Sequence, residues 1–311
     1  MNYIVLDLEW NQSEEKRKEN KLIPFEIIEI GAMKLDGRRN VVGEFSELIK
    51  PEVYSDMHHV TKNLLHMQME ELERGNSFPV VMEEFLGWCG KEEFLFCTWG
   101  PLDLIELQRN MRYYGLPSIS KKPFPYLDVQ KLFSIQFEDG KQRRTLEYAI
   151  DVLEIEKDVP FHRAFSDAYY TAKILQKISS QVLKLQSYDV FKLPQKRKDE
   201  IHVTFESYYK YISREFKTKQ LAMCDMEVLN CKCYLCGKPT RKIIRWFTAN
   251  NKHYHCISQC QEHGYLKGKI RLRKSENSNY YVIKTLKFVD EETVKTIQER
   301  QNKAKEKETN L

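Results

Sequence analysis

Two acidic residues interrupt the apolar start of the chain. Asp7 and Glu9 stand two positions apart in a run from Tyr3 that otherwise has the composition of a buried strand. Because successive side chains of a strand point to opposite faces, both carboxylates are expected on the same face. Placing two negative charges there is costly unless cations compensate them. The pair therefore indicates a divalent metal site, and a strand end that reaches solvent is the alternative.

Two further segments carry residues suited to the same chemistry. His162 and Asp167 form an H-x-A-x-x-D pattern at the start of an expected helix. Five residues along a helix rotate a side chain by about 140°, so the two converge only if His162 lies in the preceding loop, which Pro160 favours. Asp103 follows an expected strand end and a sharp turn at Gly100. That arrangement brings a further carboxylate to the same edge of the sheet.

In this order and at these separations, the motifs resemble the DEDD superfamily of 3′-5′ exonucleases, in its histidine subclass. The resemblance covers about residues 1–180 and implies the ribonuclease-H-like fold of proofreading subunits. It implies catalytic roles for five residues. These are Asp7, Glu9, Asp103, His162 and Asp167.

The resemblance also implies how these residues divide the work. Two Mg²⁺ or Mn²⁺ ions about 4 Å apart neutralise charge on the attacking and leaving oxygens of a phosphodiester. Asp7 is expected to bridge the two ions, Glu9 and Asp167 to complete the first ion's shell, and Asp103 to support the second. His162 is expected to take the proton of the attacking water, since imidazole titrates near neutral pH.

The chain departs from the family pattern at two positions. Thr61 lies in a segment similar to the one that contacts the terminal nucleotide in relatives, but Lys62 replaces the usual glycine after it. Leu102 stands where many relatives carry an aromatic residue. Thr61 is therefore only a candidate contact to nucleic acid.

Four cysteines near the C-terminus suggest a structural zinc site. Cys233 and Cys236 form a C-x-x-C-G turn, and Cys256 and Cys260 supply a second pair after 19 intervening residues. Four such ligands predict a zinc ribbon or knuckle that stabilises a small domain. A redox function of the C-x-x-C turn is the alternative. Other residues close enough to substitute as ligands are Cys231, His253, His255 and His263.

The second half of the chain is basic. Residues 1–180 hold 23 Lys and Arg against 30 Asp and Glu, and residues 181–311 hold 27 against 15. Lys269, Arg271 and Arg273 alternate with apolar residues and are expected on one face of a strand, beside Trp246 as a stacking platform for bases. This pattern predicts a surface for single-stranded nucleic acid, and a solvated basic sheet is the alternative.

The elements that must position these residues follow from the apolar periodicity. Strands are expected at residues 3–9, 25–35, 41–49, 94–98 and 280–289, and helices at 80–88, 103–114, 145–153 and 164–179. The predicted fold class is α/β, a ribonuclease-H-like mixed sheet flanked by helices, with a small, mostly β domain stapled by zinc. The predicted parts are an exonuclease domain (1–185), a charged linker or helical connector (186–228) and a basic domain with a C-terminal helix (229–311).

Length and composition limit the class of protein. The 311 residues are 41% hydrophobic and 31% charged, which predicts two globular domains and excludes a fibrous or disordered polymer. Neither a signal peptide nor a membrane span is expected. Eight cysteines, five of them within residues 231–260, suit a metal site in a reducing cytoplasm better than disulfides.

The sequence predicts a metal-dependent 3′-5′ exonuclease of single-stranded nucleic acid. RNA is favoured over DNA, because the front domain resembles the branch that trims RNA 3′ ends, including sporulation-inhibitor-like bacterial exonucleases. The expected cofactors are two Mg²⁺ or Mn²⁺ ions and one Zn²⁺. Two alternatives remain: a catalytically silent adaptor that grips RNA 3′ ends, and a DNA-editing exonuclease of a repair or replication complex. The protein partners and the oligomeric state are not predicted.

Overall fold

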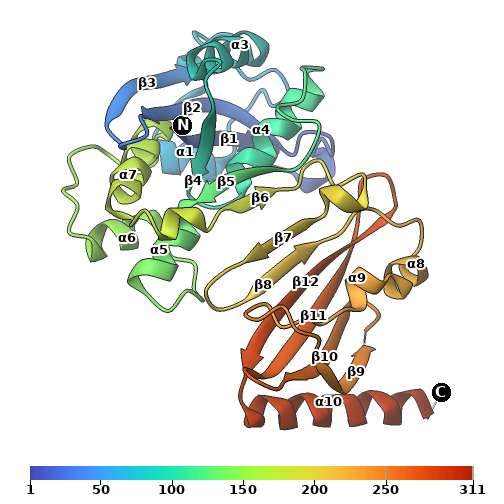
Figure 1. The fold of residues 1–311 in the computed structure, drawn as a ribbon. Helices are drawn as coiled ribbons and strands as arrows, with labels where there is room; N and C mark the ends of the chain where they lie inside the picture. The colour runs from blue at the N-terminus through green and yellow to red at the C-terminus, as the bar shows by residue number, and fades with distance from the viewer. Residues whose placement is uncertain (249, 310–311) are drawn as a thin grey trace. The chain divides into compact units, whose positions relative to one another are not determined.

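The chain folds into two compact units, residues 1–191 and 192–311 (Figure 1). This computed structural model describes residues 1–248 and 250–309, except for the side chains of 307–309. The predicted basic domain extends to residue 311, so its last two positions lie outside the described residues. Within the described ranges, no helix is both long enough and apolar enough to cross a membrane.

The first unit contains a six-stranded mixed sheet in the order β3-β2-β1-β4-β5-β6. β1, β2 and β3 are antiparallel, β4 and β5 run parallel to β1, and β6 pairs antiparallel with β5. The strands are β1 (Asn2–Gln12), β2 (Phe25–Leu35), β3 (Val41–Leu48), β4 (Phe94–Thr98), β5 (Phe124–Asp128) and β6 (Ser187–Asp189).

Helices cover both faces of this sheet. Alternation along β1 sends Ile4 and Leu6 into an apolar cluster with α3 and α4, and Val5 into a second cluster with α5, α6 and α7. The predicted ribonuclease-H-like mixed sheet flanked by helices is thus confirmed. The helices are α1 (His59–Leu65), α2 (Met69–Leu72), α3 (Phe78–Cys89), α4 (Leu102–Tyr113), α5 (Val129–Phe137), α6 (Leu146–Val152) and α7 (Ala164–Lys177).

The second unit contains a six-stranded antiparallel sheet in the order β7-β8-β12-β11-β10-β9. One face packs on α8 and α9 through Ile270 and Val282, and the other face packs on α10 through Ile297. The elements are β7 (Ile201–Thr204), β8 (Tyr209–Ile212), α8 (Lys219–Cys224), α9 (Met226–Leu229), β9 (Arg241–Thr248), β10 (His253–Cys260), β11 (Gly264–Lys274), β12 (Tyr280–Val289) and α10 (Glu291–Thr309).

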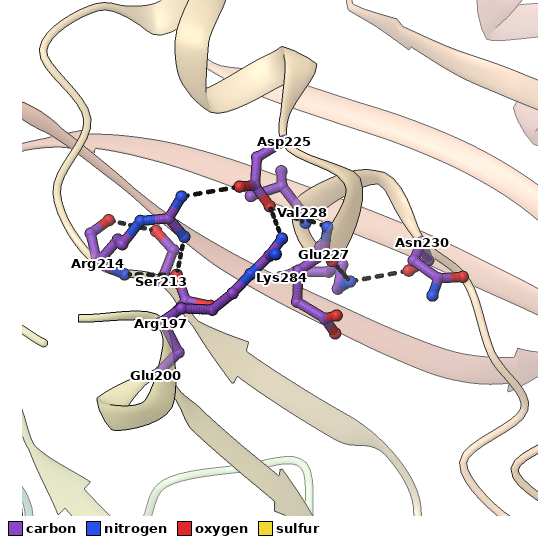
Figure 2. Close-up of polar contacts among 9 residues, drawn as sticks. All are labelled: Arg197, Glu200, Ser213, Arg214, Asp225, Glu227, Val228, Asn230 and Lys284. Atoms are coloured by element: carbon purple, nitrogen blue, oxygen red, sulfur yellow. Dashed lines mark hydrogen bonds and ion pairs between the residues drawn. The ribbon is translucent and has the colours of Figure 1, made fainter.

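A network of charged side chains, in which the Glu200 and Asp225 carboxylates are largely buried, stabilises the start of this second unit (Figure 2). The Arg214 guanidinium lies between the Glu200 and Asp225 carboxylates, at 2.6 and 2.9 Å. The Asp225 carboxylate accepts from the Glu227 and Val228 amides of α9. The Lys284 ammonium donates to the carbonyls of Glu227 in that helix and of Asn230 directly after it. Residues near Glu200 are therefore packed into the unit.

Residues 186–228 differ from the expected linker or helical connector. They contribute β6 to the first sheet and β7 and β8 to the second, besides α8 and α9. The charged composition around residue 197 concealed short strands whose apolar side chains, including Tyr211 and Ile212, are buried.

Candidate active site and metal-ligand clusters

The five residues expected to be catalytic come from β1, α4, α7 and the loop before α7. Asp7 and Glu9 lie on β1, and Asp103 lies in the first turn of α4. Asp167 lies in the first turn of α7, and His162 lies in the loop just before that helix. The ligand atoms of Asp7, Glu9 and Asp167 lie within 4.8 Å of one another. The structure thus brings together carboxylates separated by up to 160 residues.

The carboxylates of this cluster disfavour one another's charge. Burial, reinforced by the charge on Asp103, raises the pKa of Asp7 well above its usual value. Burial and the charge on Asp167 raise the pKa of Glu9 to about 8. Burial raises the pKa of Asp103 to about 7, although the Leu8 amide opposes this, and burial raises the pKa of Asp167 to about 6. Such a cluster is costly without a cation.

His162 lies in the loop before α7, where the sequence required it to be. Its backbone has a φ of 63°, which turns the chain sharply into the helix. The imidazole is 44% exposed, its Nε2 lies 4.0 Å from the Glu147 carboxylate, and its charge lowers the pKa of Asp167. An exposed ring next to the carboxylates can exchange protons with water at the site.

Three neighbours of the cluster were missed by the sequence analysis. A Cβ atom on Gly31 would lie 2.0 Å from the Phe165 amide nitrogen, so only glycine lets α7 approach β2 this closely. Glu29 is buried and forms an ion pair with Arg163. A lone glycine inside a strand, and a charged residue among Ile27, Ile28 and Ile30, were the signals available.

Thr61, the candidate nucleotide contact, is largely buried. Its hydroxyl donates to the Trp10 carbonyl at 3.3 Å, one residue beyond Glu9. The preceding His58 and His59 stack with ring centres 4.4 Å apart, and Glu14 accepts from His59. The segment is therefore anchored beside the end of the carboxylate strand.

The cysteine cluster differs from the expected set at one position. The ligand atoms of Cys233, Cys236, Cys260 and His263 lie within 4.8 Å of one another, and Cys256 is not among them. Cys256 and Cys260 are both on β10, where four residues span about 13 Å, too far for one ion. The Cys256 thiol instead lies 3.5 Å from that of Cys231.

The four grouped residues fit a tetrahedral ion. The Cys260 sulfur lies 3.7 Å from that of Cys236 and 3.6 Å from His263 Nδ1, and Cys233 also lies 3.6 Å from that nitrogen. Bonds of about 2.3 Å to sulfur and about 2.0 Å to nitrogen give ligand separations of about this size. Gly237, with a φ of 70°, closes the C-x-x-C turn.

The basic row of β11 is arranged as the alternation predicts, but Trp246 is not beside it. Arg271 and Arg273 are exposed and Lys269 partly so, whereas the Ile270 side chain between them is buried. The Trp246 ring packs with Ile270 on the opposite face, and its indole N–H donates to the Leu229 carbonyl at 3.0 Å. The structure therefore places Trp246 on the face opposite the basic row and not beside it, as the sequence analysis expected.

Comparisons with known proteins match the first unit. A rat (Rattus norvegicus) protein named 3′-5′ exoribonuclease 1 is 19% identical over 164 residues. The matched residues are 50% of this chain and 46% of that protein, so the chain spans only about half of that relative's length. The crystal structure of the nuclease domain of 3′hExo, a DEDDh family member bound to rAMP, is 18% identical, covers 57% of this chain and 90% of that chain, and has a TM-score of 0.49.

A second solved structure and a family model complete these comparisons. E. coli exonuclease I in complex with an oligonucleotide is 13% identical, covers 83% of this chain and 54% of that chain, and has a TM-score of 0.44. Residues 4–175 match the model of the family described as Exonuclease (RNase_T). Since that match spans more than half of the 311 residues, the chain belongs to this exonuclease family.

Proposed function

We propose that this protein is a metal-dependent 3′-5′ exonuclease that hydrolyses phosphodiester bonds at the 3′ end of single-stranded nucleic acid, with RNA favoured over DNA, in the cytoplasm. Membership of the exonuclease family supports the reaction type, and the name of the exoribonuclease relative supports RNA. The single observation that carries the proposal is the convergence of the Asp7, Glu9 and Asp167 carboxylates within 4.8 Å.

The donor set fits divalent cations. The Asp167 Oδ1 atom is buried and has no hydrogen-bond partner among the described residues. Together with the raised pKa values of its neighbours, this unsatisfied oxygen favours a hard cation with carboxylate ligands. Asp7, Glu9 and Asp167 would hold one Mg²⁺ or Mn²⁺ ion. Asp7 would also be a ligand of a second ion, which Asp103 would support. Such ions, when bound, neutralise charge on the attacking and leaving oxygens of a phosphodiester.

His162 serves as the general base in this proposal. Its ring is exposed enough to reach a water at the 3′ end, and it stands directly before the helix that carries Asp167. After it takes the proton, the imidazolium is stabilised by the Asp167 and Glu147 carboxylates.

The second unit has two roles in this proposal, a structural zinc site and a surface that binds nucleic acid. We assign one structural Zn²⁺ to Cys233, Cys236, Cys260 and His263, on the ligand separations above. The basic row of Lys269, Arg271 and Arg273 is the proposed contact to phosphates. Desolvation, followed by the positive charge of this row, lowers the pKa of His253. Thr61 remains a proposed contact to the terminal nucleotide.

One assay tests the proposed reaction. Purified protein with Mn²⁺ is incubated with single-stranded RNA and DNA of the same sequence, labelled at the 5′ end. A ladder that shortens stepwise from the 3′ end, with RNA degraded faster, is the expected result. Tight binding without cleavage would favour the silent adaptor, whereas preferential cleavage of DNA would favour the editing exonuclease.

A further inference from the structure

We infer that the ion pair between the buried Glu29 carboxylate and the partly exposed Arg163 guanidinium is a positioning pair that holds His162 and the first turn of α7 against the carboxylates of β1. The inference rests on the proposed function, which it deepens by assigning work to two residues outside the catalytic five. Neither residue needs to touch the substrate for this role.

The pair has the geometry of a rigid clamp. The Arg163 Nε atom lies 3.2 and 3.0 Å from the two Glu29 oxygens, and Nη2 lies 3.0 Å from Oε1. The Glu29 side chain is 2% exposed. A guanidinium that donates to both oxygens of a buried carboxylate fixes direction as well as distance, which a flexible ammonium cannot do.

The clamp joins two elements of the active site. Glu29 on β2 lies directly opposite Glu9 on β1, and the register shifts immediately after this pair. Arg163 is the residue after His162, and its carbonyl accepts from the Asp167 amide at 2.9 Å. A change in the position of Arg163 therefore moves the proposed base and a proposed ligand together.

Two backbone features leave this segment dependent on the clamp. His162 adopts a left-handed φ of 63°, which a non-glycine residue maintains only when its surroundings hold it. Gly31 lets the backbone of Ala164 and Phe165 contact β2. Because glycine has no side chain, this contact does not restrict rotation of α7 about its own axis. The Glu29 carboxylate, two residues from Gly31, supplies the missing directional contact.

The pair also balances charge at the site. Burial is the largest cause of the raised pKa values of Asp7, Glu9 and Asp167, the Glu29 charge adds to each of them, and the Arg163 charge lowers that of Glu9. An unpaired Glu29 would add a further negative charge to the cluster. Neutralising both partners of the pair, by contrast, leaves the net charge of the site unchanged.

The test compares Glu29→Gln and Arg163→Lys with a matched control in the same unit. Glu106 is the control, because its carboxylate is 3% exposed and pairs with Arg109 within α4, as Glu29 is 2% exposed and pairs with Arg163. Each variant is assayed for kcat and KM on a short single-stranded oligonucleotide with Mn²⁺, for Tm, and for hydrogen exchange of residues 159–167 without added divalent cation.

We expect Glu29→Gln to lower kcat by about 10- to 100-fold with KM nearly unchanged, since small misplacement of catalytic groups has effects of this size. Arg163→Lys keeps the positive charge but loses the two-nitrogen contact of the guanidinium with both Glu29 oxygens, and should give a smaller loss of kcat. Exchange should rise in residues 159–167 in both variants. Glu106→Gln should lower Tm by a similar amount and leave kcat and that exchange unchanged.

Equal kcat and equal exchange for Glu29→Gln and Glu106→Gln would overturn the inference. If Glu29→Gln does not fold, Arg163→Lys decides by the same comparison. If the wild-type protein cleaves no oligonucleotide, the proposed function fails, and the exchange measurement alone decides whether the pair holds the His162 segment.

Discussion

The two clusters of metal-ligating side chains relate to their surroundings in opposite ways. In residues 1–191, the carboxylates lie on β1, α4 and α7, and the apolar side chains of these elements already pack in clusters on the two faces of the sheet. In residues 192–311, Cys233 and Cys260 are themselves buried members of an apolar cluster with Leu266 and Leu286. The first unit is therefore expected to fold with its site empty, whereas the second uses its ligands as part of the core.

The clusters also differ in charge. Burial and mutual repulsion raise the pKa values of the carboxylates, so without a bound cation these groups destabilise the fold of their own unit. In the second cluster, by contrast, the hydrogen bond with His263 lowers the pKa of the Cys260 thiol to about 6, the opposite direction to the carboxylates. The difference is consistent with the proposed roles, reaction for the first cluster and stability for the second, and each prediction below tests one side of that contrast.

The largest effect is expected from removing one charge at the first site. Asp7→Asn should lower hydrolysis by about a thousandfold or more, because it removes the proposed shared ligand of both ions. The same variant should unfold at a higher temperature than wild type without added divalent cation, because it relieves repulsion. Parallel oligonucleotide assays and thermal melts measure both changes. A variant that retains near wild-type rates would remove the two-metal proposal.

The second prediction concerns zinc. Protein purified without added zinc should contain about one Zn²⁺ per chain. His263→Ala and Cys236→Ser should abolish this zinc and make the region beyond residue 200 sensitive to protease, while residues 1–191 remain resistant. Metal analysis and limited proteolysis of the full chain provide both readouts.

Cys256→Ser is the control for this experiment. Because Cys256 lies outside the ligand group, this variant should keep its zinc. Loss of zinc from Cys256→Ser together with retention in His263→Ala would restore the ligand set expected from the cysteine spacing and contradict the structure.

The residues that the sequence located correctly are those tied to a local period. Asp7 and Glu9 share a face because a strand alternates, and His162 had to precede the helix for Asp167 to join it; both expectations match the structure. The same alternation identified the buried Ile270 between basic neighbours. Spacing within one element is thus readable without knowledge of the fold.

The errors come from contacts between elements. The spacing of Cys256 and Cys260 suggested a ligand pair, but both residues lie on the same extended strand, β10. His263 lies near Cys260 because it is in the short turn between β10 and β11, which begins at Gly264. Trp246 was assigned to the wrong face because its neighbours across the sheet were unknown. β5 and α5 were missed because Asp128 joins a strand directly to a helix with no intervening loop.

The third prediction concerns pH and the first unit. A raised pKa means that the folded protein keeps protons that the unfolded chain has already released, so stability falls as pH rises. For Glu9 this interval runs from its ordinary value of 4.5 to about 8, at about 1.4 kcal/mol per pKa unit. Without added divalent cation, the unfolding free energy of residues 1–191 should therefore decrease between these pH values.

Hydrogen exchange within residues 1–191, measured in increasing urea, reports this free energy. Mg²⁺ or Mn²⁺ should stabilise the unit more at pH 8 than at pH 5, and Asp7→Asn should show a flatter pH dependence than wild type. A wild-type stability that rises across the same interval would contradict the electrostatic description of the carboxylate cluster.

The smallest effect is expected on the basic row of β11, where binding is separable from chemistry. Replacing Lys269, Arg271 and Arg273 with Gln should weaken binding of a long single strand and lower the slope of log affinity against log salt by about 2, since each phosphate contact contributes about 0.7. Cleavage of a mononucleotide ester, which reaches only the carboxylate site, should not change. If the slopes of the variant and the wild type are equal, the row is a solvated surface. The role of the second unit would then be structural, and the contrast between the two units would rest on zinc alone.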